Sequence, residues 1–266
     1  MDYDFNKAGL YPAAWAAFKA NWQMISIFGA GLIFLEIVAS YFDSKYLMIF
    51  GSIFIGAYIA FLFHKSIIYG NKNQPTADST WKNPKWYNPQ GNGTQNGFLW
   101  RCLLIFFSIL GISMITILPF GSYFRSHGLS NDEAKATAIF FVIPLWLILY
   151  GATLAFIGTI LPATVAKGKN SIKAAMARGR KTFWLTLGRL ILGPLAFLVL
   201  ATIGIGVAYL NLPMNIYNTG GWNWVDTIMA VPITFAHIFT TGLTATALCK
   251  SYLRYEQRPD QTPDPV

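Results

Sequence analysis

Long apolar runs recur along the whole chain, and they constrain its fold more than any other feature. Several extend over about 20 residues, and a helix of that length crosses a hydrocarbon core about 30 Å thick. Only 12% of the 266 residues are charged, whereas soluble domains carry about 25%. The sequence therefore predicts an all-α fold, a polytopic membrane helical bundle whose backbone polar groups bond within each helix.

The apolar runs predict six transmembrane helices in a single integral membrane domain, residues 1–266. We expect the spans at about 22–42, 46–70, 97–120, 136–166, 183–210 and 224–253. Short interfacial amphipathic helices are expected beside them. Trp15, Phe18 and Trp22 share one helical stripe, which predicts such a helix before the first span, although a plain extension of that span fits equally well. The polar stretch 71–96 has no helical or strand period and is predicted to be a cytoplasmic loop.

Positive charge is distributed unequally between the two sides that these spans define. Seventeen of the 20 Lys and Arg residues lie at the N-terminus, in and beside loop 71–96, in the stretch 167–189 or near the C-terminus. The opposite side holds only Lys45, Arg125 and Lys135. Because basic residues stay on the cytoplasmic side, both termini are predicted to face the cytoplasm. The net charge of +9 then indicates anionic lipid, and no nucleic acid, as the partner.

The densest positive charge lies in the segment 161–184, LPATVAKGKNSIKAAMARGRKTFW. It leaves one apolar span and is interrupted at Pro162. It then carries six Lys and Arg residues among small and apolar ones before the next span begins. This composition is typical of a segment that lies at the membrane surface.

Five basic residues of this segment are candidates for binding lipid or a partner: Lys169, Lys173, Arg178, Arg180 and Lys181. Each basic side chain near an anionic leaflet contributes about 1 kcal/mol of binding free energy. If a helix begins at Ser171, Lys173, Arg180 and Lys181 lie off a stripe formed by Ile172, Met176, Gly179 and Phe183. A signal that only sets topology, without any ligand, explains the same charges.

Loop 71–96 contains an aromatic group, Trp81, Trp86 and Tyr87, interleaved with prolines and lysines. Such a group can dock another membrane-protein subunit. It can equally anchor the loop at the bilayer interface, as aromatic belts do. The sequence supports both interpretations.

Ionisable side chains inside the predicted spans are few, and the main ones are Glu36, His64 and His237. A charge at the bilayer centre costs about 2.5–3.5 kcal/mol or more, so such residues often mark a transport pathway. Their depths step across the membrane, which favours a small-solute or proton-coupled transporter that uses Glu36 and His237. Neutral histidines and a protonated glutamate cost little, so a bundle that transports nothing fits as well.

Standard catalytic and metal-binding patterns are absent from the sequence. It contains no G-x-S-x-G, H-E-x-x-H or paired-cysteine motif. Its three histidines, at positions 64, 127 and 237, are predicted at different membrane depths. We therefore expect a protein that is not an enzyme and that binds no metal or cofactor.

Three passages resemble a known family: LPATVAKGKNSIKAAMARGR, FLFHKSIIYG at the end of the second span, and ALCKSYLRYE at the end of the sixth. Together they resemble six-span bacterial inner-membrane proteins that are similar to the membrane domain fused to some glycerophosphodiester phosphodiesterases. The resemblance implies a lipid-associated helical domain in the bacterial inner (plasma) membrane, with no agreed activity and no transferable catalytic residue. The expected function is binding of anionic lipid or a membrane-complex partner through the basic cytoplasmic face.

Overall fold

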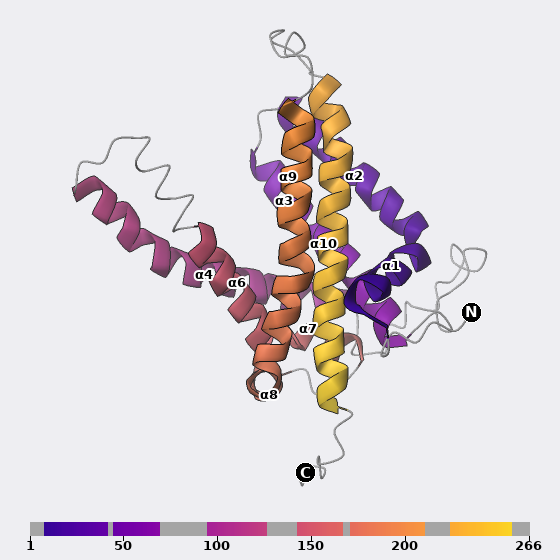
Figure 1. The fold of residues 1–266 in the computed structure, drawn as a ribbon, viewed down its shortest axis with the longest axis vertical. Coiled ribbons are helices and arrows are strands. Elements are labelled where there is room, and N and C mark those ends of the chain that lie inside the picture. Colours follow the sequence, from indigo (N-terminus) through magenta and orange to yellow (C-terminus); the bar gives the residue numbers. More distant parts are fainter. Residues whose placement is uncertain are drawn as a thin grey trace.

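Helices form every regular element of the computed structural model (Figure 1). The structure describes residues 8–41, 45–69, 95–126, 143–166, 171–210 and 224–256. Its elements are α1 (Leu10–Ala20), α2 (Trp22–Tyr41), α3 (Lys45–Tyr69), α4 (Gln95–Ser126), α6 (Ile143–Ile157), α7 (Ile160–Val165), α8 (Ile172–Leu190), the π-helical turn η4 (Ile191–Leu195), α9 (Ala196–Leu210) and α10 (Trp224–Glu256). Within these ranges there is no strand, which confirms the predicted all-α fold.

Five helical stretches in the described part of the chain are long and apolar enough to cross a membrane, or six if the bent pair α1–α2 forms one span. They lie in α3, in α4, in α6–α7, in the continuous stretch α8–η4–α9, and in α10. By length and composition the chain is therefore a multi-pass membrane protein. The structure differs from the sequence prediction at residue 183, where a span was expected to begin, because α8 runs through that position without a break.

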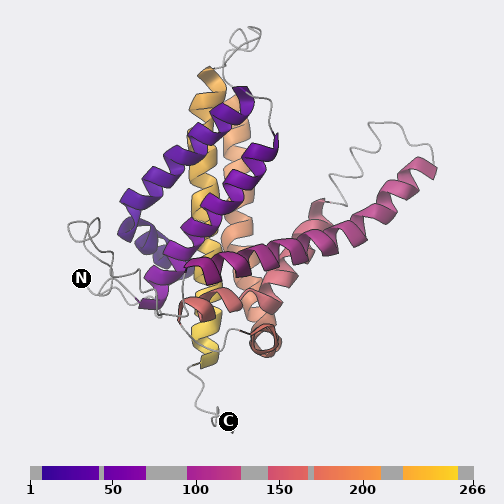
Figure 2. The same ribbon diagram turned by 180° about the vertical axis from the view of Figure 1, so that it is seen from behind.

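Helix α10 is the axis of the bundle. It contacts α1, α2, α3, α7, α8, η4 and α9, and it runs beside α9 in both views (Figures 1 and 2). Small residues allow this close packing, because helices in lipid associate where their backbones can approach. At Gly242, a Cβ atom would lie 2.7 Å from the ring of Phe63, so an alanine at this contact between α10 and α3 would displace that buried ring.

Helix α1 is a short wedge packed against α3 and α10. Three of its alanines, at positions 13, 14 and 17, are fully buried, and the chain bends by 86° between α1 and α2. Asn21 stabilises the bend by donating to the Ala17 carbonyl at 2.7 Å and to the Ser66 hydroxyl at 2.5 Å. The helix expected before the first span is present, and Trp15 contacts Phe239 of α10 at 6.1 Å between ring centroids.

The chain turns at η4, between α8 and α9. Figure 1 looks almost along α8, whereas α9 rises beside α10. Pro194 lies inside the turn and lacks the N–H that an α-helix needs. The hydrogen bonds shift accordingly, with the Ala196 N–H donating to the Ile191 carbonyl. The hydroxyl of Tyr11 donates to the Leu192 carbonyl at 3.0 Å and so fixes α1 against the turn.

Helix α8 crosses the end of α10 at a steep angle. Arg178 and Arg189, which are about 16 Å apart along α8, both contact the last turns of α10. Their α10 partners, Glu256 and Ser251, are only about 8 Å apart along that helix. Helix α8 therefore lies across the bundle end, while α9 packs along α10 through Phe197 and Phe239, whose ring centroids are 5.0 Å apart.

Helices α4 and α6 form an arm that extends sideways from the bundle (Figures 1 and 2). Near the start of α4, the buried Phe98 packs against Phe61 of α3 with ring centroids 5.3 Å apart. Farther along, α4 exposes large apolar side chains, among them Phe107 and Ile115. Exposed apolar side chains on a membrane helix are suited to contact with lipid.

The close packing of α8 on α6 gives a test of the fold. A Cβ atom at Gly179 would collide with the backbone carbonyl of Phe156, whereas a Cβ atom at Gly188 would meet nothing within 4 Å. We expect Gly179→Ala to lower the free energy of unfolding by about 1–3 kcal/mol, because the backbone of α6 has to move. Thermal unfolding in detergent, followed by tryptophan fluorescence, measures this loss.

The matched control is Gly188→Ala on the same helix. It should leave the stability unchanged or raise it slightly, because alanine favours helix over glycine. Equal destabilisation by the two variants would contradict the close contact of α8 with α6.

Candidate functional site

The outer face of α8 presents basic and apolar side chains together. Lys173, Arg180 and Trp184 lie on one outward line of the helix and are all exposed, and Trp184 is 80% exposed. Lys181 is also exposed, and its ammonium group lies 5.5 Å from the ring centroid of Tyr255 on α10. We call these four residues, Lys173, Arg180, Lys181 and Trp184, the basic face.

The small residues of α8 lie on the side opposite the basic face and pack against neighbouring helices, so the basic face points outward. The opposite face buries Ala175, Arg178, Gly179, Thr182, Thr186 and Leu190. Ser171 begins the helix, since its hydroxyl accepts a hydrogen bond from the Ala174 N–H at 3.2 Å. The apolar stripe expected from the sequence is divided, because Ile172 and Met176 are exposed whereas Gly179 is buried. Small and hydroxyl-bearing residues pack between helices here, which leaves larger apolar ones to face outward.

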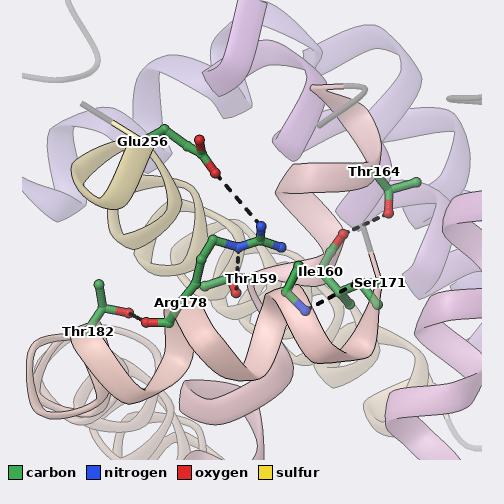
Figure 3. Close-up of polar contacts among 8 residues, drawn as sticks. Thr159, Ile160, Thr164, Ser171, Arg178, Thr182 and Glu256 are labelled. Atoms are coloured by element: carbon green, nitrogen blue, oxygen red, sulfur yellow. Dashed lines mark hydrogen bonds and ion pairs between the residues drawn. The ribbon is translucent and has the colours of Figure 1, made fainter. Parts of the chain in front are cut away.

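Arg178 is separated from the other basic candidates because it points into the protein (Figure 3). It is only 2% exposed. Its Nη1 lies 3.8 Å from Oε1 of Glu256, and its Nε donates to the Thr159 hydroxyl at 3.4 Å. Its guanidinium also lies over the ring of Tyr252, 5.3 Å from the centroid. The Arg178 side chain therefore ties α8 to α7 and α10.

Sequence reasoning missed the three partners of Arg178: Thr159, Tyr252 and Glu256. Arg178 and Arg180 are the same residue type two positions apart, and Glu256 lies far along the chain. The available signal was the run of small residues Ala175, Gly179, Thr182 and Thr186, which shares a helical face with Arg178. An arginine on a small-residue face is placed to contact a neighbouring helix.

Several predicted site residues lie outside the described residues. Lys169, Trp81, Trp86 and Tyr87 belong to the ranges that the structure leaves out, and so does loop 71–96. Glu36 lies in α2, but its side chain is outside the described part. The roles assigned to these residues remain predictions.

The two histidines predicted inside the membrane, His64 and His237, occupy different surroundings. His64 is 1% exposed, and its Nδ1 lies 2.8 Å from the Ala60 carbonyl oxygen. Its ring packs against Phe98, 5.3 Å between centroids. His237 is exposed on α10. The structure therefore does not bring these two histidines together, and the transporter hypothesis remains a prediction.

The described residues contain no group of three or more His, Cys, Asp or Glu side chains able to hold a metal ion. Comparisons of the chain with protein-family models, with curated proteins and with solved structures give no match in any of the three.

Because Arg178 is buried and Arg180 is exposed, replacing Arg178 should destabilise the protein more than replacing Arg180. We expect Arg178→Ala to lower the free energy of unfolding by about 2 kcal/mol or more, because it removes a buried side chain and its hydrogen bond. Arg180→Ala on the exposed side should stay within about 0.5 kcal/mol of the wild type. Parallel thermal unfolding of both variants in detergent measures the difference, and equal effects would show that Arg178 does not tie α8 to its neighbours.

Proposed function

We propose that this is a non-enzymatic bacterial inner-membrane protein that binds anionic phospholipid through the basic face of α8. The observation that carries the proposal is that α8 exposes Lys173, Arg180 and Lys181 beside Trp184, while Arg178 is buried and paired with Glu256. Three cations are thus presented at the surface, where a headgroup can reach them.

The mixture of side chains on α8 favours lipid over an acidic protein partner. A helix that lies in the plane of the membrane surface carries Lys and Arg on one face and Trp or aliphatic residues for the acyl boundary. Exposed Ile172 and Met176 lie on the same helix as the basic face. The crossing of α8 over the end of α10 lets these apolar side chains enter the boundary while the longer cations reach phosphate.

The distribution of charge supports an orientation with both termini in the cytoplasm. In the described residues, the basic face and the last turn of α10 lie at the same end of the bundle, as their Lys181–Tyr255 contact shows. Basic residues remain on the cytoplasmic side of a bacterial membrane. The basic face would then meet the cytoplasmic leaflet, where anionic lipid gives it a negative surface potential.

The proposal predicts that neutralising the basic face weakens lipid binding. Each cation near an anionic surface contributes about 1 kcal/mol, so Lys173→Gln, Arg180→Gln and Lys181→Gln together should lower the affinity for phosphatidylglycerol by about 100-fold. The measurement titrates this lipid into detergent-solubilised protein and counts bound molecules by native mass spectrometry. Zwitterionic phosphatidylcholine should bind weakly to both forms.

A charge-matched control replaces Lys72, Lys82 and Lys85 by glutamine, which removes the same charge from the predicted cytoplasmic loop. This control should keep its lipid affinity. An unchanged affinity in the α8 variant would refute the proposal. Loss of a stoichiometric co-purifying protein from the α8 variant, with lipid binding intact, would reassign the basic face to a protein partner.

A further inference from the structure

Arg189 of α8 contacts α10 one turn before Arg254, on the side of α8 opposite the basic face. Arg189 of α8 donates from Nη1 to the Ser251 hydroxyl of α10 at 3.2 Å. Arg254 lies three residues after Ser251, so it is on the same face of α10 as the residue that Arg189 contacts. We propose that Arg189 and Arg254 form an anion site that binds a phosphate group.

The orientation of Arg189 leaves most of its donors available. A guanidinium carries five N–H groups in a planar fork, and among the described residues the bond to Ser251 is the one that this group makes. Ser251 is fully buried, and its hydroxyl donates to the Ala247 carbonyl at 2.9 Å. That bond directs an oxygen lone pair toward Arg189, so the fork is held in place before any ligand arrives.

The two arginines lack the neutralising carboxylate that Arg178 has. Three turns earlier on the same face of α8, Arg178 is paired with Glu256. Within the described residues, neither Arg189 nor Arg254 has an ion-pair partner of this kind. Two positive charges at neighbouring positions of two packed helices repel each other, and an anion between them relieves that repulsion. A phosphate oxygen pair matches the guanidinium fork in both charge and geometry.

The ends of the helices do not explain both arginines. A cation in the last turn of a helix interacts favourably with its dipole, and this explains Arg254, since α10 ends at Glu256. It does not explain Arg189, because helical structure continues from α8 through η4 into α9. The charge of the half-buried Arg189 is therefore the one that a bound anion would stabilise more.

The site is independent of the proposed function, since neither arginine belongs to the basic face. Two sources supply the phosphate group: the headgroup of an anionic phospholipid, or free phosphate from the aqueous phase. Binding in either case links α8 to α10, so it should stabilise the folded protein.

The test compares the full-length protein with Arg254→Gln, Arg189→Gln and Arg189→Lys. Arg254 is exposed and makes no hydrogen bond within the described residues, so its variant should fold normally. We expect Arg254→Gln and Arg189→Gln each to lower the affinity of one bound phosphatidylglycerol at least tenfold, read by native mass spectrometry. Arg189→Lys keeps the charge but loses the fork, and should give a smaller loss. The control Arg101→Gln, whose native side chain bonds within its own helix at the Gly97 carbonyl, should change nothing.

A second arm adds inorganic phosphate to delipidated protein and measures thermal unfolding against sodium chloride of equal ionic strength. Stabilisation by phosphate alone, lost in Arg254→Gln, would identify free phosphate as the ligand. If the variant with Lys173→Gln, Arg180→Gln and Lys181→Gln still binds one phosphatidylglycerol tightly, this site is separate from the proposed function of the basic face. Unchanged lipid affinity in both glutamine variants, together with no stabilisation by phosphate, would overturn the site.

Discussion

The ion pair between the buried Arg178 and the exposed Glu256 sets the position of α8, and the rest of the site depends on it. A guanidinium that is 2% exposed needs partners, because an uncompensated buried charge costs several kcal/mol. Thr159, Tyr252 and Glu256 provide those partners from α10 and from the residue preceding α7. With one arginine held inward, helical geometry places Lys173, Arg180 and Trp184 outward. The rotation of α8 about its axis that points Arg178 into the protein therefore also points the other basic residues outward.

The turn at η4 makes this arrangement compatible with a membrane bundle. Helix α9 packs along α10, whereas α8 crosses its end, and one continuous helix joins them. Pro194 lacks the backbone N–H that a straight α-helix needs at this turn. The hydroxyl of Tyr11 donates to the carbonyl of Leu192 in the same turn. Helix α1 therefore stabilises the turn between α8 and α9. Small residues at each contact, such as Gly179 and Gly242, let the backbones approach closely enough for these bonds to form.

The sequence predicted the helical membrane fold because long apolar runs permit few alternatives. It also selected Lys173, Arg180 and Lys181 as candidates from the density of basic residues, and the structure shows these three side chains exposed. It could not separate Arg178 from them, because the distinction depends on Glu256, 78 residues away. Arg189 and Arg254 were likewise missed as a pair, because each looks like an ordinary basic residue at the end of an apolar run. The candidates on loop 71–96 stay predictions, since that loop lies outside the described residues.

The most direct test of the account is a depth measurement along α8. Both native cysteines, at positions 102 and 249, are replaced by alanine, and single spin labels are placed at successive positions from 172 to 186 in protein reconstituted with phosphatidylglycerol. Collision with oxygen and with a water-soluble relaxant gives the depth of each label in the membrane. If α8 lies across the bundle end at the surface, the depth will oscillate with the helical period around the headgroup level. A depth that increases steadily from position 172 to 186 would show that α8 enters the bilayer as a span, and would contradict the account.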